Sequence, residues 1–234
     1  YIITTDDALT AATNGMNYAV VNSDGTMAQG STQLGSFRTT EGVTATWHKN
    51  GVDIWVTVVQ ANSTNILSYL LKCDGFDTTP VVSPVGIATV SRSNERGGIA
   101  FSWDSEKFAG GFHPTSGANK VRLYDFDNAT GILTFDKGIG SGVVHPYASY
   151  GVTFSPDNSR VLASSSWGHV FSLDIATGVG TSLIANSGWP GAIEIGADGS
   201  LYIGGLSGTA TRKLSGNLNN GSSLTVTSLA TIGS

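Results

Sequence analysis

The stretch "YGVTFSPDNSRVLASSSWGHVFSLDIATG", from Tyr150 to Gly178, alternates strand-forming runs with short turns. Val, Leu, Phe and Thr fill the runs "GVTF", "RVLASS" and "HVFSLD", whereas Pro, Asp, Asn and Gly fill the separating segments "SPDN" and "IATG". The stretch therefore predicts three successive β-strands. Because a unit this short cannot bury both faces of its own sheet, it needs neighbours of the same kind.

The chain contains such neighbours. Three further stretches have the same order, namely "GVTATWHKNGVDIWVTVVQANSTNILSYLLKCDG" (42–75), "GGIAFSWDSEKFAGGFHPTSGANKVRLYDFDNATG" (97–131) and "GAIEIGADGSLYIGGLSGTATRKLSG" (191–216). Their first turns fall at Asn50, Asp104, Asp157 and Asp198, at steps of 54, 53 and 41 residues. A repeat of about 40–50 residues with four strands is typical of a propeller blade. The sequence therefore predicts an all-β fold, a β-propeller of four-stranded antiparallel blades.

The first blade is predicted to be incomplete, whereas the last has all of its strands. "YIITTD" (1–6) matches the second strand of the other units and "MNYAVVN" (16–22) matches the third, so the innermost strand of the first blade is missing. "SLTVTSLATI" (223–232) supplies a fourth strand to the last blade. We count five blades, the first incomplete, and interpret residues 1–234 as a single propeller domain that is a fragment of a longer chain.

Composition narrows the classes of function. Charged residues make up 12% of the chain, against about 25% in an average domain, and the net charge is −5. No basic stripe is present to meet phosphates, which argues against nucleic acid as a partner. No apolar run approaches the length of a membrane span. Cys73 is the single cysteine, which excludes an internal disulfide, and its strand-like surroundings predict a small core residue.

Several stretches in a fixed order carry a family resemblance. They are "YIITTD" and "NGMNYAVVN", then "WHKNGVDIWVTVVQANSTNILSYLL" and "TTPVVSPVG", then "VRLYDFDNATG", "YGVTFSPDNSRVLASSS" and "GAIEIGADGSLYIGG". Together they resemble the WD-like propeller domain of large secreted surface proteins of Bacteroidota, which type IX secretion exports and which often carry gliding-motility-associated tail domains. The resemblance covers nearly the whole chain. It implies an extracellular surface or adhesive module and gives no catalytic residue.

One face of a propeller collects the loops that enter each inner strand and those that join second to third strands. On this face the sequence places seven aromatic or imidazole side chains, Phe112, His113, His145, Tyr147, Trp167, His169 and Trp189. We interpret them as candidates for a face that binds carbohydrate or protein. The alternative is that the rings wedge between neighbouring blades. The opposite face receives short turns, in which Asp, Asn and Gly serve the turn geometry.

A propeller hydrolase or lyase would place acid–base groups at the starts of the inner strands, around the axis. The candidates there are Glu41, Glu95, Arg96 and Tyr150, beside His145 and Trp189. They form no matched ring of carboxylates and no nucleophile–base pair, so no catalytic residue is assigned. "YDFDNATG" (124–131) has the oxygen donors of a calcium loop but not its later Gly and Glu, which favours a hairpin turn. No metal and no cofactor are predicted.

The leading hypothesis is a non-catalytic extracellular recognition or structural module of a surface adhesin or an assembled appendage. The alternatives are a propeller hydrolase or lyase with a site at the axis, and a surface protein of a phage or virion. Because unpaired strand edges recruit other strands, we expect upstream residues or a neighbouring subunit to cover Tyr1–Asp6. The alternative is closure by Leu224–Ile232 of the same chain.

Overall fold

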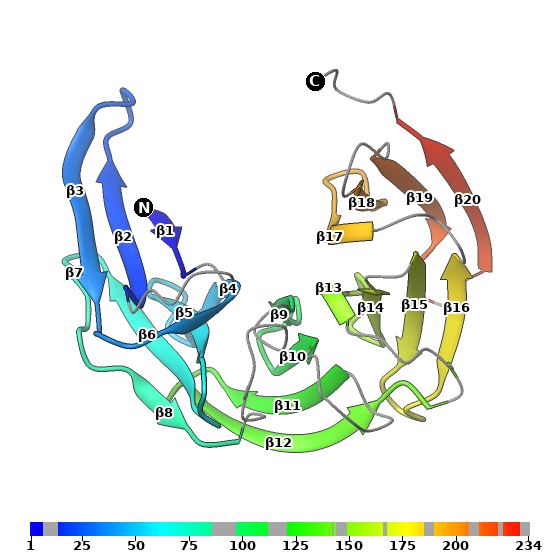
Figure 1. Ribbon diagram of the computed structural model, residues 1–234, viewed down its shortest axis with the longest axis horizontal. Coiled ribbons are helices and arrows are strands. Elements are labelled where there is room, and N and C mark those ends of the chain that lie inside the picture. Colours follow the sequence, from blue (N-terminus) through cyan, green and yellow to red (C-terminus); the bar gives the residue numbers. More distant parts are fainter. Residues whose placement is uncertain are drawn as a thin grey trace. The chain divides into compact units, whose positions relative to one another are not determined.

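The computed structural model describes residues 1–6, 14–85, 97–111, 121–141, 143, 149–165, 168–184, 190–205, 211–219 and 222–229. Within these ranges the chain forms twenty strands joined by turns, and no helix (Figure 1). The all-β class predicted from the alternation of strand and turn residues is confirmed.

The strands pair into five sheets in chain order (Figure 1). The first sheet contains β1 (Ile2–Thr4), β2 (Met16–Val21) and β3 (Met27–Leu34). The second contains β4 (Thr39–Trp47), β5 (Ile54–Gln60) and β6 (Ile66–Lys72), and both β7 (Gly75–Phe76) and β8 (Val81–Ser83) pair with β6. The third contains β9 (Ile99–Phe101), β10 (Lys107–Gly111), β11 (Val121–Asp127) and β12 (Ile132–Ile139). The fourth contains β13 (Ser149–Phe154), β14 (Arg160–Ser165), β15 (His169–Asp174) and β16 (Gly180–Ile184). The fifth contains β17 (Pro190–Ile195), β18 (Leu201–Gly205), β19 (Arg212–Asn217) and β20 (Ser222–Ser228).

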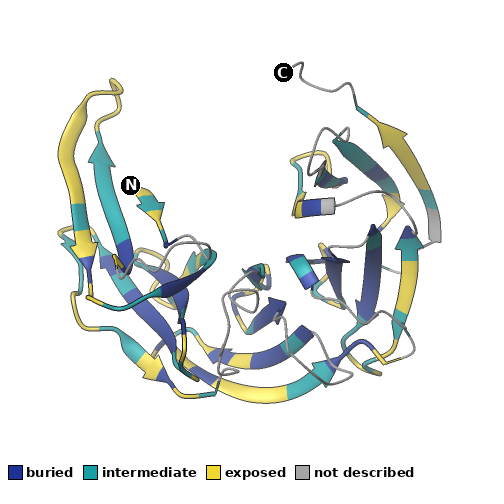
Figure 2. Ribbon diagram, viewed as in Figure 1, coloured by how far each residue is buried: buried dark blue, intermediate teal, exposed yellow. Residues whose placement is uncertain are grey.

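These sheets are the predicted blades. In each of the last four sheets, the first strand in chain order lies at one edge, and the later strands follow in chain order toward the other edge. This is the strand order of a propeller blade. The first sheet has three described strands, and that β1 is the counterpart of a second strand stays a prediction. The fourth strand of the second blade differs from the prediction, because it is divided into β7 and β8. Figure 2 shows the burial gradient that follows, with β14 mostly buried and the outer strand β16 mostly intermediate or exposed.

The first turn of four blades has one conformation. The residue that follows the turn Asn or Asp has a positive φ, 70° at Gly51, 62° at Ser105, 59° at Asn158 and 74° at Gly199. The side-chain oxygen of the Asn or Asp accepts the N–H two residues further on, as from Ser159 N to Asp157 Oδ1 at 3.0 Å. The same bond occurs at Asn50, Asp104 and Asp198. The spacing that predicted the repeat is therefore the spacing of one self-bonded turn.

The described residues divide into two compact units, Tyr1–Arg96 with Phe126–Thr134, and Gly97–Asp125 with Phe135–Ser234. The single domain expected for 1–234 stays a prediction. In the first unit, apolar side chains of the first two blades share a core of Met16, Leu34, Val56, Val58, Leu67, Tyr69 and Leu71. In the second unit, one core joins the third and fourth blades around Leu123 and Phe154. Another joins the fourth and fifth blades around Leu162 and Leu214.

In the first unit, the turn between β11 and β12 bonds to the first turn of the second blade. The carbonyl of Asn128 accepts the indole Nε1–H of Trp55 at 2.9 Å and the backbone N–H of Lys49 at 3.1 Å. The Trp55 side chain is 4% exposed and meets the ring of Phe126 edge-on. A buried indole N–H needs an acceptor, and this hairpin tip supplies it.

The second unit contains an equivalent contact. The carbonyl of Asn219, in the turn between β19 and β20, accepts Arg160 Nε–H at 2.8 Å and Ser159 Oγ–H at 3.3 Å. Its side-chain oxygen accepts the N–H of Asp157 at 3.4 Å. In both units, then, an outer hairpin tip bonds to the first turn of the preceding blade.

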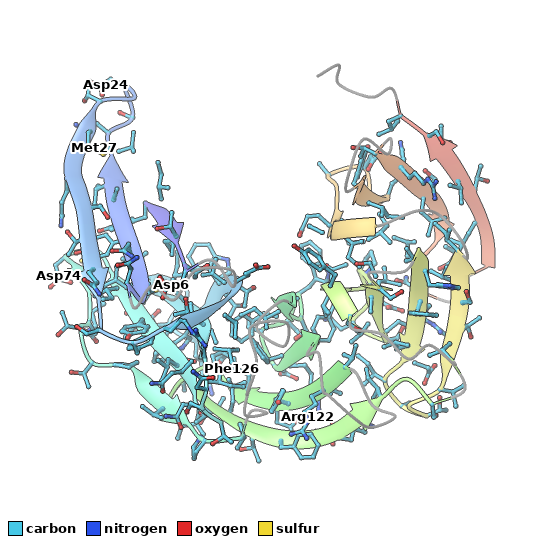
Figure 3. All side chains as sticks on the ribbon, viewed as in Figure 1. Asp6, Asp24, Met27, Asp74, Arg122 and Phe126 are labelled. Carbon is cyan, nitrogen blue, oxygen red and sulfur yellow. The ribbon has the colours of Figure 1, made fainter. Side chains whose placement is uncertain are left out.

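Asp6 attaches the first blade to the second. Its buried carboxylate accepts the N–H groups of Asn14, Gly15 and Thr39, at 3.2, 3.1 and 3.3 Å (Figure 3). In return, the N–H of Asp6 donates to Thr39 Oγ1 at 3.0 Å. The neighbouring Thr5 Oγ1 donates to the carbonyl of Glu41 at 3.0 Å. Residues 5 and 6 of the predicted open edge are therefore covered by β4.

Cys73 is exposed, so the prediction of a core position is wrong. The strand β6 ends at Lys72, which pairs with Gly75, and this register leaves Cys73 and Asp74 as the two residues of a tight hairpin turn. The prediction extends the strand one residue beyond its end at Lys72.

Candidate functional site

The predicted site residues divide between described and undescribed positions. His169, Glu41 and Tyr150 are described, at the start of β15 and within β4 and β13. The others lie outside the described residues, namely Phe112, His113, His145, Tyr147, Trp167, Trp189, Glu95 and Arg96. The described part of the candidate binding face consists of the strand ends next to these positions.

These strand ends meet in the second unit. Ser149 stands opposite Ser165, and Ser165 stands opposite His169, in the register of β13, β14 and β15. An added Cβ at Gly111, the last residue of β10, would lie 2.8 Å from Ser149 Cβ. Ser164 Oγ donates to the carbonyl of Gly191 at 2.8 Å. The loop-stem cluster is the name used below for Gly111, Ser149, Ser165, His169 and Gly191.

The loop-stem cluster brings together the attachment points of four segments. The segments 112–120, 144–148, 166–167 and 185–189 begin or end within one or two residues of it. These segments contain all of the binding-face candidates except His169 itself. That these candidates share one end of the blades stays a prediction, because only the stems of their segments are described.

Close backbone packing sets the positions of these stems. Gly151 N donates to Ser164 Oγ at 2.8 Å, and the same hydroxyl donates onward to the next blade. A Cβ at Gly151 would lie 2.7 Å from the backbone nitrogen of Ile193. Glycine is required at this close approach because no side-chain carbon fits between the two inner strands.

Two serines in the cluster were missed by the sequence reasoning. Ser149 is 6% exposed and Ser165 is 1% exposed, and Ser165 Oγ has no hydrogen-bond partner among the described residues. His169, which faces Ser165 across the strand pair, is half-buried and stacks on Phe171 with ring centroids 5.7 Å apart. The signal in the sequence was the run of serines that ends "RVLASSS", at the point where an apolar strand should stop.

The axis candidates contribute backbone contacts. In the second unit the carbonyl of Tyr150 accepts the N–H of Gly98, which joins the inner strands of two blades. In the first unit the carbonyl of Glu41 accepts the hydroxyl of Thr5. The side chains of Tyr150 and Glu41 are both half-buried.

The carboxylates of the short turns accept hydrogen bonds from residues of their own turns. Asp127 accepts the N–H of Ala129 at 3.0 Å and the hydroxyl of Thr130 at 2.8 Å, and these bonds lower the pKa of Asp127. Asp174 bonds Thr177 in the same way, which lowers the pKa of Asp174. The hairpin-turn interpretation of "YDFDNATG" is confirmed. Across the described ranges, no three His, Cys, Asp or Glu side chains gather to hold a metal ion.

Asp198 is the most strongly perturbed carboxylate of these turns. Lys213 Nζ lies 2.7 Å from Asp198 Oδ2, and the N–H of Ser200 donates to the other oxygen. The hydrogen bond from Lys213 is the larger cause and lowers the pKa of Asp198 to about 2.

Nowhere in the described portions is there a helix of the length and apolarity needed to cross a bilayer.

The blade order, the repeated first turn and the contacts between blades define a β-propeller protein. No family model and no curated protein sequence matches the chain. Solved structures do match the chain, and these matches show the class of its fold.

Three of these structures illustrate the likeness. The chain is similar to a candidate 6-phosphogluconolactonase from Bacteroides uniformis, at 17% identity and a TM-score of 0.63, with 91% of this chain and 63% of that chain covered. It is similar to the β-propeller domain of Cps50 (Swd1) from Myceliophteria thermophila, at 13% identity and a TM-score of 0.54, covering 86% and 59%. It is similar to a Lactobacillus plantarum protein, at 11% identity and a TM-score of 0.63, covering 99% and 68%. The chain thus spans less than two thirds of the first two proteins, and at these identities the likeness shows the fold alone.

Proposed function

We propose that this chain is a non-catalytic recognition module of an extracellular surface protein, and that it binds carbohydrate or protein through the segments that leave the loop-stem cluster. The observation that carries the proposal is the convergence of the cluster, in which Gly111, Ser149, Ser165 and His169 are neighbours. Segments with adjacent stems are able to bring their aromatic side chains to one ligand.

The chemistry of the two ends of the blades supports this assignment. At the short-turn end, the Asp and Asn side chains accept hydrogen bonds from their own turns, so their polar groups are already used. At the other end, the sequence places Trp, Tyr, Phe and His among Ser, Asn and Gly, with few charges. That mixture is typical of a surface that stacks on sugars or on apolar side chains. The resemblance to secreted surface proteins of Bacteroidota supports an adhesin or an assembled appendage as the parent protein.

Tryptophan substitution tests the proposal. Trp167→Ala and Trp189→Ala each remove a candidate contact ring, whereas Trp103→Ala removes a ring that is 58% exposed in a short first turn. Binding is screened on a glycan array and on immobilised extracellular protein fractions, with thermal unfolding as the measure of folding. We expect Trp167→Ala and Trp189→Ala to weaken the ligand found by at least about tenfold, as for central aromatic contacts. Trp103→Ala should bind as the original chain does. Equal loss in all three variants, or no loss in any, would contradict the proposed face.

One described pair favours a hydrolase or lyase as the second candidate. Ser165 carries a buried hydroxyl with no hydrogen-bond partner among the described residues, and its cross-strand neighbour is His169, so the residue types of a nucleophile and its base are adjacent in register without a hydrogen bond between them. The candidate 6-phosphogluconolactonase among the similar structures makes sugar lactones a first substrate class to assay. Turnover that Ser165→Ala abolishes, with unfolding temperature unchanged, would replace the recognition proposal by this one.

A further inference from the structure

The hairpin between β11 and β12 packs on Trp55 of the second blade. The Trp55 indole donates to the carbonyl of Asn128 at 2.9 Å, and the side chain is 4% exposed. The ring of Phe126, which Figure 3 labels, meets the indole edge-on. A Cβ added at Gly131 would lie 2.7 Å from Trp55 Cη2. All of these residues belong to the first unit, so the hairpin tip covers a buried indole there.

His48 joins the same hairpin to the first turn of the second blade. Its Nδ1 lies 3.0 Å from the backbone nitrogen of Asn50, and its Nε2 lies 3.1 Å from the carbonyl oxygen of Ala129. A backbone N–H can only donate and a carbonyl can only accept, so Nδ1 is the acceptor and Nε2 carries the proton. The two backbone partners therefore fix one neutral tautomer of the ring.

A second proton on this ring would convert Nδ1 into a donor. It would then face the N–H of Asn50, which also donates, across 3.0 Å. The charged ring can keep its bond to Ala129 or turn toward another acceptor, but it cannot make both described contacts. Imidazoles gain this proton between about pH 8 and pH 5. The contact is therefore complete with the neutral ring and loses a bond when the ring becomes charged.

Three charged side chains belong to the two turns that meet at the His48 ring. The β4–β5 turn supplies Lys49 and Asp53, and the β11–β12 turn supplies Asp127. Asp53 Oδ2 accepts Asn50 Nδ2–H at 2.8 Å, and Asp127 accepts bonds from its own turn, as described above. Among the described residues neither carboxylate bonds to the ring, so neither already serves as the acceptor that a protonated Nδ1 needs.

We propose that His48 makes the attachment of the 126–134 hairpin to the second blade pH-sensitive, so that the hairpin is held when the ring is neutral and loosens when the ring takes a second proton. Loosening uncovers the rings of Trp55 and Phe126, which are 4% and 5% exposed in the attached state. This device acts within the first unit, is separate from the loop-stem cluster and does not depend on the proposed function.

The second unit provides an internal reference. Its equivalent hairpin contact is made by Arg160, whose Nε–H donates to the carbonyl of Asn219 at 2.8 Å. A guanidinium keeps its charge and its donors over the whole interval in which an imidazole gains a proton. The second contact should therefore not respond to a change of pH that loosens the first.

Hydrogen exchange of the 234-residue chain, followed by NMR at about pH 7.5 and about pH 5, measures the loosening. The readouts are Trp55 Nε1–H and the amide of Leu133, which donates to Ser83 Oγ at 2.9 Å. After correction for the intrinsic pH dependence of exchange, we expect their protection to fall at least about fivefold at the lower pH, as for the loss of one hydrogen bond. The amide of Asp157, which bonds to Asn219, should keep its protection.

Two substitutions remove the titrating ring. His48→Gln keeps a side-chain N–H that can donate to Ala129, and His48→Asn keeps an oxygen for the N–H of Asn50, as in the other first turns. In both variants the protection of Trp55 and Leu133 should differ less than about twofold between the two pH values. Unfolding temperatures at the higher pH show that the variants are folded. The ¹⁵N shifts of the His48 ring measure the tautomer without any substitution, and a proton on Nε2 is expected.

Unchanged protection of Trp55 and Leu133 at the lower pH in the original chain would overturn the proposal. An equal loss of protection in the original chain and in both variants would do so too, because the response would then not come from His48. A matching loss at Asp157 would show that acid acts on the whole fold. A neutral ring with its proton on Nδ1 would remove the bond from Asn50 on which the proposal depends.

Discussion

Removing the Asp6 carboxylate tests how the first blade is held to the second. Asp6→Ala deletes an acceptor that is 5% exposed and takes three backbone N–H groups, from Asn14, Gly15 and Thr39. After the substitution these donors have no partner unless water enters or the loop moves. A buried donor without an acceptor costs about 1–3 kcal/mol.

The size of the loss follows from the geometry. The three bonds are long, between 3.1 and 3.3 Å, which places each at the low end of that range. The substitution also removes the desolvation cost of the buried carboxylate, which offsets part of the loss in stability. We therefore expect Asp6→Ala to lower the free energy of unfolding by about 3 kcal/mol. Asp6→Asn keeps one acceptor oxygen but sets an NH₂ group against a donor, so we expect about 1–2 kcal/mol.

Urea unfolding followed by tryptophan fluorescence measures the change. At an m-value of about 3 kcal/mol per molar, a loss of 3 kcal/mol lowers the midpoint by about 1 M. Asp24→Ala is the control, because Asp24 lies at the exposed tip of the β2–β3 hairpin and accepts bonds only from Thr26 among the described residues (Figure 3). Its midpoint should change far less. Equal midpoints for Asp6→Ala and the original chain, or equal shifts for Asp6→Ala and Asp24→Ala, would refute the reasoning.

Two further predictions concern the second unit. Gly151→Ala places a Cβ 2.7 Å from Ile193 N and 3.1 Å from Gly191 O, both backbone atoms that cannot rotate away, so we expect a loss of about 3 kcal/mol in urea unfolding. Gly30→Ala, with no atom within 4 Å, should change it by less than about 0.5 kcal/mol, and similar losses in both would contradict the packing argument. For Asp198, the pKa of about 2 in the folded chain lies below the ordinary 3.8, so its ion pair stabilises the fold above about pH 4 and is lost as the pH falls from about 4 to 2. The unfolding temperatures of Asp198→Asn and the original chain should therefore converge by about pH 2, and a constant difference from pH 6 to pH 2 would count against this ion pair.

The repeat and the fold class were predictable because they depend on local residue pattern. The steps between Asn50, Asp104, Asp157 and Asp198 mark turns that bond to themselves, so nothing distant in the chain is needed to recognise them. The same is true of the hairpin at Asp127, where the carboxylate bonds within three residues. Hydrogen bonds between residues this close in the chain can be predicted from the sequence alone.

The contacts between blades were not predictable, because their partners are distant in the sequence and include backbone atoms. Trp55 donates to a carbonyl 73 residues away, and carbonyls carry no sequence signal. Cys73 was misplaced because a shift of one residue at the end of a strand exchanges a core position for a turn. The burial of the Ser165 hydroxyl without a partner among the described residues depends on the register of three strands, which the spacing of the repeat does not specify.

The two ends of the blades are under different physical constraints, and this difference bears on where binding evolves. At the short-turn end, the carbonyls of Asn128 and Asn219 accept bonds from the preceding blade, so the length of each outer hairpin is coupled to the turn beside it. An insertion there breaks contacts between blades as well as the turn. At the loop-stem cluster, the described bond between blades joins residues of two strands, Ser164 in β14 and Gly191 in β17. Connecting segments in general tolerate changes in length and composition better than the strands that they join. The aromatic residues that the sequence carries in the segments next to these stems are the reason for proposing recognition at this end of the second unit.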